Sequence, residues 1–286
     1  MQDYTTLTEL ALMLLAIGAV GGLISGMLGI GGGMVFVPAL YYTFTHMGST
    51  PEKAMHVAIA TSLGLVMFTG ATSAYWHHKK GSVDFKILKS WGPFVVTGVA
   101  VGTYFASSMD GGFLKKFFAA AALVMAVYMA RSKEKEKPDD EPLAAASHGT
   151  IPRKNHGKKA LLYAVCVVIG AIAAMIGIGG AMMTIPAMTY TGTPMRKAVG
   201  TGGAIGTAIA IPGVIGYILS GWAYRAELPP YSLGYINLLA LVMIVPLSFM
   251  LSPVGVHISH SMPRTTLRRL FAVLLFVVSI RMFTAA

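Results

Sequence analysis

The sequence predicts an all-α polytopic membrane protein made of two inverted repeats, each with about five hydrophobic segments. Of the 286 residues, 55% are hydrophobic and 12% are charged, which is about half the charge of a typical soluble domain. Several runs of about 20 residues carry almost no charge, and this is the length of a membrane-spanning helix. Short patterns also recur in the same order in both halves, as in transporters with internal repeats.

The apolar segments fall into two groups on either side of a charged stretch. They cover residues 7–28, 34–47, 55–76, 87–107 and 112–131, and then 160–178, 181–191, 198–220, 232–251 and 267–285. The stretch between them is rich in charge and proline and has no apolar period, which is typical of a solvated linker. We therefore expect a first membrane repeat at 1–131, a charged cytoplasmic linker at 132–159 and a second membrane repeat at 160–286. The N-terminus lacks the basic residues of a signal peptide, so the first segment is expected to be a retained span.

Three short patterns support the internal repeat. The pairs are GIGGGMVFVPAL (29–40) with GIGGAMMTIPAM (177–188), IATSL (59–63) with VGTGG (199–203), and LKKFF (114–118) with LRRLF (267–271). The first pair is offset by 148 residues and the second by 140, through Thr61 and Thr201.

The net charge of +11 is explained by basic loops on one side of a membrane and does not indicate a nucleic-acid partner. Basic residues cluster at 77–86 and in the linker, and again at 192–197 and 252–266. If these segments are cytoplasmic, both termini lie outside and the second half is inverted relative to the first. Residues 221–232 then form an outer loop.

Segments 34–47 and 181–191 are too short to span a bilayer, since they offer 14 and 11 residues where about 20 are needed. Each follows a glycine run and contains a proline, Pro38 or Pro186. Short segments interrupted by glycine and proline at matching positions of two halves indicate broken helices that meet near the midplane. The first N–H groups of such a helix are unpaired and lie at the positive end of its dipole. The two breaks are therefore predicted to form an anion site made of backbone.

The candidate substrate-binding residues are the break glycines and the hydroxyls in the segments that follow them: Gly29, Gly31, Gly32, Gly33, Thr61, Ser62, Gly177, Gly179, Gly180 and Thr201. The threonines have an alternative use, which is a bond to the helix carbonyl four residues earlier. A different set of glycines is spaced four apart, as in close helix packing: Gly18, Gly22, Gly26, Gly98 and Gly102.

Residues 18–51, 161–195 and 198–223 contain no Asp, Glu, Lys or Arg. A bound anion would therefore be held mainly by dipoles and hydroxyls, and no intramembrane carboxylate is available as a proton relay. His56 is the candidate titrating residue, with an interfacial polar role as its alternative. The single cysteine, Cys166, and the scattered methionines fit core packing, so we expect no metal site, no cofactor and no enzymatic activity.

The GIGGGMVFVP run, its copy GIGGAMMTIP, and the stretches ATSLG (60–64) and GSVDF (81–85) resemble the sulfite exporter TauE/SafE family. The resemblance implies a bacterial inner-membrane permease for sulfur-containing anions, such as sulfite and organosulfonates. It also places functional weight on Gly31, Gly32, Gly33, Thr61, Ser62, Gly179, Gly180 and Thr201. One departure is Gly202, which stands where the first half has Ser62, so the two half-sites are expected to differ.

The sequence thus predicts a secondary transporter for a small sulfur-containing anion, working in a lipid bilayer. An anion channel of the same architecture, or a permease for another small anion or a metal ion, stays open as an alternative. A homodimer is open as well. No lysine of a nucleotide-binding loop follows the glycine run, so ATP is not expected to drive transport.

Overall fold

The computed structural model describes residues 2–28, 32–131 and 156–284. This part of the chain forms ten α-helices, one short 3₁₀ helix and one two-stranded hairpin. The helices are α1 (Gln2–Leu28), α2 (Gly33–His46), α3 (Pro51–Lys79), α4 (Phe85–Ser108), α5 (Gly111–Arg131), α6 (His156–Ile176), α7 (Ala181–Tyr190), α8 (Met195–Gly221), α9 (Leu238–Ser261) and α10 (Arg264–Thr284). The 3₁₀ helix η1 is Trp222–Tyr224, and the strands are β1 (Ser232–Leu233) and β2 (Ile236–Asn237). The predicted all-α class is confirmed.

Five of the described helices are long and apolar enough to cross a membrane. The spans are Thr8–Met27, Pro51–Lys79, Gly111–Arg131, Lys197–Tyr224 and Leu238–Ile258. The second of these is the most enclosed, because α3 lies at the centre of the bundle and most of its residues are buried by other helices. The chain is therefore a polytopic membrane protein whose lipid-facing helices surround a central one.

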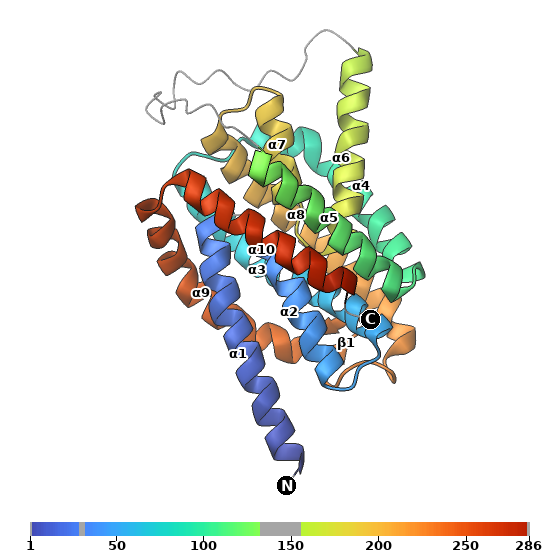
Figure 1. The fold of residues 1–286 in the computed structure, drawn as a ribbon. Helices are drawn as coiled ribbons and strands as arrows, with labels where there is room; N and C mark the ends of the chain where they lie inside the picture. Colours follow the sequence, from blue (N-terminus) through green and yellow to red (C-terminus); the bar gives the residue numbers. More distant parts are fainter. Residues whose placement is uncertain (1, 29–31, 132–155, 285–286) are drawn as a thin grey trace.

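The two halves contribute their helices in the same order, with one short helix second in each. Helix α1 packs along α9 and α6 packs along α4, while α3 packs against α8. Figure 1 shows α5 and α10 lying side by side, and α10 also contacts α2. Each half is therefore completed by helices of the other half, and neither forms a separate bundle.

Two boundaries differ from the sequence expectation. The segment expected at 232–251 begins and ends later, as α9 at Leu238–Ser261, because the hairpin of β1 and β2 occupies its first residues. Two prolines lie inside α9, and prolines are tolerated in membrane helices because neighbouring groups satisfy the freed backbone. The loop expected at 252–266 is accordingly reduced to residues 262–263. In the predicted linker, α6 begins at His156, and the remainder lies outside the described residues.

The glycines spaced four apart bring helix backbones into direct contact, as predicted. A Cβ on Gly18 would lie 3.2 Å from the backbone of Ile244, and Gly22 and Gly26 abut the α9 backbone further along. On α4, Gly98 and Gly102 abut the backbone of α6 at Val167 and Ala171. These stripes fix the α1–α9 and α4–α6 pairs at the short distances that only small residues allow.

Segments predicted on the same side of the membrane lie together in the structure. The Lys53 Nζ atom is 3.6 Å from the Glu227 Oε2 atom, which joins the start of α3 to the predicted outer loop. At the opposite set of loops, Gly200 on α8 packs against the Ser82 backbone. Lys53 also lies over the Tyr224 ring, with its Nζ atom 3.5 Å from the ring centroid.

Replacing Gly98 with Ala is expected to lower the free energy of unfolding by about 1–3 kcal/mol, because the new methyl group would overlap the Val167 carbonyl oxygen. Gly92 is a matched control on the same helix, since a Cβ there meets nothing within 4 Å. Gly92→Ala should leave stability unchanged or raise it, because alanine is the better helix former. Thermal unfolding in detergent would measure both variants. Equal melting temperatures for the two would contradict the close α4–α6 contact.

Candidate functional site

The chain breaks at matching places before α2 and α7. Helix α6 ends at Ile176 and α7 begins at Ala181. Between them Gly177, Gly179 and Gly180 all have φ of 71°, and Gly32 before α2 has φ of 73°. This left-handed conformation is strained for residues with a Cβ, so glycine is required for the chain to turn this sharply into each short helix.

Each short helix begins with an N–H group for which the described residues provide no hydrogen-bond partner. In α2 the Val35 and Phe36 N–H groups donate to the Gly32 carbonyl, and in α7 Met183 and Thr184 donate in the same way to Gly180. Among the described residues, no hydrogen bond is made by the N–H groups of the intervening methionines, Met34 and Met182. Both groups lie at the positive end of a helix dipole, so each offers a donor to an anion.

The two breaks meet against α3. A Cβ on Gly33 would lie 2.6 Å from the Gly177 carbonyl oxygen and 2.7 Å from the Ile178 Cα atom, so the two backbones touch. Gly177 also lies against the backbone of Ile59 on α3. The Ser62 hydroxyl, one turn further along α3, donates to the Gly177 carbonyl at 2.8 Å. This buried bond ties the second break to the first half of the chain.

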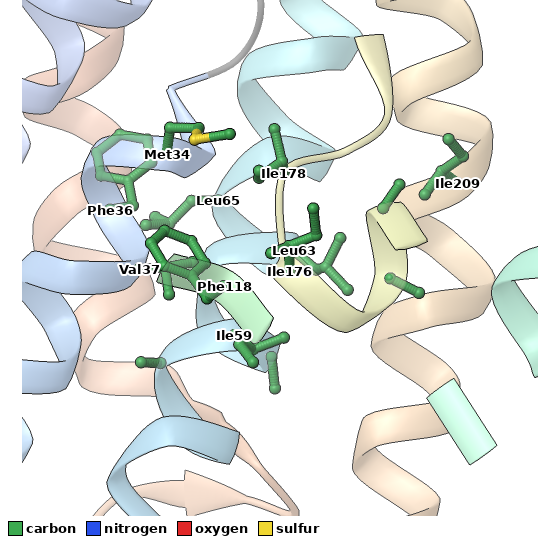
Figure 2. Packing of buried hydrophobic residues seen from close by; sticks show 14 of the residues in the cluster. Met34, Phe36, Val37, Ile59, Leu63, Leu65, Phe118, Ile176, Ile178 and Ile209 are labelled. Carbon is green, nitrogen blue, oxygen red and sulfur yellow. The ribbon is translucent and has the colours of Figure 1, made fainter. Parts of the chain in front are cut away.

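A small cavity with an apolar lining lies where the short helices begin. It is lined by Met34, Met125, Ala173, Ile176, Ile178, Gly180, Met182 and Met183. Figure 2 shows Met34 at the start of α2 and Ile178 on the second break facing one another across this region. The cavity has about 10 Å³ of room for the centre of a water molecule, which is enough for about one water. An oxyanion is larger than this space.

The structure brings together six of the predicted site residues. They are Gly32, Gly33, Ser62, Gly177, Gly179 and Gly180, all at or beside the two breaks. Gly29 and Gly31 lie outside the described residues. The two threonines are fully buried, but their hydroxyls bond to other groups.

Thr61 and Thr201 make matching bonds to backbone N–H groups at the starts of other helices. The Thr61 Oγ1 atom accepts from the Asn237 N–H group at 2.9 Å, and the Thr201 Oγ1 atom accepts from the Asp84 N–H group at 2.9 Å. Asn237 caps α9 and Asp84 caps α4 through their side-chain oxygens. We name these two contacts the threonine latches. Each joins a central helix of one half to a helix of the other half, and each hydroxyl keeps a hydrogen to donate.

Sequence reasoning missed the two capping residues and the two methionines. The capping residues could have been found from the sequence, because GSVDF (81–85) matches GYINL (234–238) and this match aligns Asp84 with Asn237. The first residue of each pattern has a left-handed φ, 65° at Gly81 and 55° at Gly234. The methionine pair could have been found from the 148-residue offset, which aligns Met34 with Met182.

His56 lies away from the cavity and is buried. Its ring nitrogens are 2.9 Å from the Glu52 carbonyl oxygen and 3.1 Å from the Ala106 carbonyl oxygen. It is therefore part of the bundle rather than an exposed interfacial side chain. Within the described residues there is no group of three or more His, Cys, Asp or Glu placed to hold a metal ion, and Cys166 is buried in the core.

Thr61→Val and Thr201→Val are each expected to lower stability by about 1–3 kcal/mol. Valine keeps the shape of threonine but leaves a buried N–H group, that of Asn237 or Asp84, without an acceptor. Thr→Ser at each position is the control, because serine keeps the hydroxyl oxygen. Thermal unfolding of the four variants measures the effect. A valine variant as stable as its serine partner would contradict a latch at that position.

Comparison with known proteins extends over nearly the whole chain. The sulfite exporter TauE/SafE family profile matches residues 14–282. A Haemophilus influenzae protein named "Probable membrane transporter protein" is 31% identical over 95% of this chain and 97% of its own length. Similarly named proteins from Methanocaldococcus jannaschii and Bacillus subtilis are each 26% identical. The first match covers 94% of both chains, and the second covers 76% of this chain and 83% of the relative.

No solved structure matches the chain. The family match spans both breaks, both threonine latches and all ten described helices at least in part. The chain belongs to the sulfite exporter TauE/SafE family of membrane transporters.

Proposed function

We propose that the chain is a secondary transporter for small sulfur-containing anions, such as sulfite or organosulfonates, in the bacterial inner membrane. The observation that carries this proposal is that two short helices begin at one cavity, at Met34 and Met182, whose N–H groups have no hydrogen-bond partner among the described residues. Two helix N-termini directed at a common space favour negative charge there. The oxygens of sulfite and of sulfonates are acceptors for such donors.

The charge distribution favours an anion over a cation. The sequence around both breaks lacks acidic residues over 18–51 and 161–195. A divalent or alkali cation would need carboxylate or carbonyl ligands, while two positive dipole ends would repel it. The methionine sulfurs around the cavity are soft ligands, but the same dipoles oppose a cation among them. The choice of sulfur compounds as substrates rests on the family resemblance.

Alternating access follows from the correspondence between halves. In an inverted arrangement the two threonine latches lie toward opposite faces, and each holds a helix start of one half on the central helix of the other. Opening one latch at a time would expose the cavity to one side only. The small size of the cavity fits an occluded state of such a cycle. Methionine side chains suit this step because they are flexible and reshape easily.

Sulfite, sulfoacetate or taurine is expected to raise the melting temperature of the detergent-purified protein, because a ligand that binds only the folded state stabilises it. At a concentration 100-fold above the dissociation constant the gain is about 2.7 kcal/mol. Chloride and phosphate are the control anions. Stabilisation by divalent or soft metal ions, with none from any sulfur anion, would contradict the proposed substrate class.

Gly33→Ala is expected to reduce saturable uptake of the stabilising anion into proteoliposomes by at least about tenfold. The added Cβ would press on the Gly177 carbonyl and Ile178, and so displace the two helix starts from each other. Gly92→Ala is the control, because its Cβ meets nothing within 4 Å. Thermal unfolding would confirm that each variant is folded.

Normal uptake by folded Gly33→Ala would refute a site at the breaks. Flux that does not saturate with substrate in the unaltered protein would instead indicate a channel of the same architecture.

A further inference from the structure

We propose that the turn between α3 and α4 binds the headgroup of an anionic phospholipid. The surface consists of Lys79, Lys80, Lys86 and Lys89, and we name it the basic turn. This inference goes beyond the proposed transport function and does not depend on which anion is carried. The apolar span of α3 ends at Lys79, and α4 begins at Phe85. The turn between them therefore lies where a bilayer has its headgroups.

The basic turn has no counter-charge from the described part of the chain. All four lysines are exposed, and none forms an ion pair with another described residue. Asp84 is the only acidic residue within 53–109, and its carboxylate is occupied in capping α4, where it accepts from the Lys86 and Ile87 N–H groups. Helices α6 and α8 pack against α4, and residues 156–226 contain no Asp or Glu. An external anion is therefore free to supply the missing charge.

The opposite end of α3 shows the contrast. There the Lys53 ammonium lies 3.6 Å from the Glu227 carboxylate and over the Tyr224 ring. An anion approaching Lys53 would have to compete with a protein carboxylate. An anion approaching the basic turn would displace only water and mobile counter-ions, so its attraction to the lysines is not offset by a broken ion pair.

Aromatic side chains border the basic turn. Tyr75, Trp76 and Phe85 are each about half exposed. The Lys79 Nζ atom lies 4.7 Å from the Tyr75 ring centroid and 5.4 Å from that of Trp76. Tyrosine and tryptophan are enriched at membrane–water interfaces, where one part of the ring is wet and the other meets acyl chains. Lysines beside such rings are placed to reach the phosphate groups of the lipid.

The exposed face of α4 favours a lipid over a free phosphate ion. It begins with Lys86 and Lys89 and continues with Pro93, Thr97 and Val101, all exposed and spaced so that they share one face. The Thr97 hydroxyl is bonded to the Pro93 carbonyl, so this later part is effectively apolar. A phospholipid matches both parts, with its phosphate at the lysines and an acyl chain beyond them. A free phosphate ion matches only the first part.

The same turn carries one of the threonine latches. The Asp84 N–H group donates to Thr201 on α8, and the Ser82 backbone packs against Gly200. A headgroup that bridges the lysines would therefore hold the turn in the shape that closes this latch. Because such a lipid binds the folded state, it should also stabilise the protein.

The direct test is quenching of tryptophan fluorescence by brominated lipids in the reconstituted full-length protein. Trp76 borders the basic turn, while Trp222 lies in η1 near the start of α3, and the two are 54% and 51% exposed. Trp222→Phe leaves Trp76 as the exposed reporter, and Trp76→Phe leaves Trp222. Trp91 is buried in both. The lipid is present in both leaflets, so the result does not depend on the orientation of the protein.

We expect brominated phosphatidylglycerol to bind beside Trp76 at least about fivefold more tightly than brominated phosphatidylcholine. This is the contribution of about one lysine beside an anionic lipid surface. Beside Trp222 the two lipids should bind within about twofold of each other, since that region lacks a comparable cluster of lysines.

Two paired variants separate the basic turn from general attraction to a basic protein. Lys80→Gln with Lys86→Gln should bring phosphatidylglycerol within about twofold of phosphatidylcholine beside Trp76, because it removes half of the charge of the basic turn. Lys116→Gln with Arg225→Gln also removes two exposed basic side chains, but near the start of α3, and should retain the preference. Exposed substitutions of this kind cost little stability, and thermal unfolding would confirm that both pairs are folded.

Three results would overturn the proposal. One is equal binding of the two lipids beside Trp76, and another is a preference that survives in Lys80→Gln with Lys86→Gln. The third is recovery of Trp76 fluorescence when millimolar inorganic phosphate is added, since this would show a site for free phosphate. None of these measurements uses a sulfur anion or alters a residue at the cavity, so each outcome leaves the proposed transport function to its own tests.

Discussion

The close approach of three backbone segments, at Gly33, Gly177 and Ile59, is the constraint on which the rest of the structure depends. No side chain separates these segments, so they meet only because glycine occupies the two break positions. The contact leaves the first turns of α2 and α7 beside one small cavity. It also places α3 at the centre, since this helix must touch both breaks. The burial of α3 by the surrounding helices follows from that position.

The same contact shows how the two halves differ. Ser62 donates to the Gly177 carbonyl from α3, while its counterpart on α8 is Gly202, which has no hydroxyl to donate and packs against Ile185. The second break is therefore anchored by a side-chain bond that the counterpart of Ser62 cannot supply to the first. By contrast, the hydrogen bonds of the two threonine latches, at Thr61 and Thr201, have the same length. In both, the threonine hydroxyl accepts from a backbone N–H group. We infer that opening and closing can be alike at the two ends although the two half-sites are not equivalent.

The sequence predicted the helical class, the two short helices and the packing role of the glycine stripes, because these depend on local composition and spacing. It predicted the residues at the breaks for the same reason, since consecutive glycines in an apolar run have few other uses. It could not place the Thr61 hydroxyl, because its partner is 176 residues away and the choice between substrate and backbone depends on tertiary contacts. Hydrophobicity also placed the start of α9 too early in the sequence. The hairpin before this helix depends on Gly234 and Asn237 rather than on hydrophobicity.

The separation between the cavity and the titratable groups has a physical consequence for transport. An anion held by dipoles alone, with no buried counter-charge, is bound weakly enough to leave on the far side. The same absence of charge means that the cavity has no side chain with which to exchange a proton. Any coupling to protons must then act through a group placed elsewhere and joined to the cavity by rigid contacts.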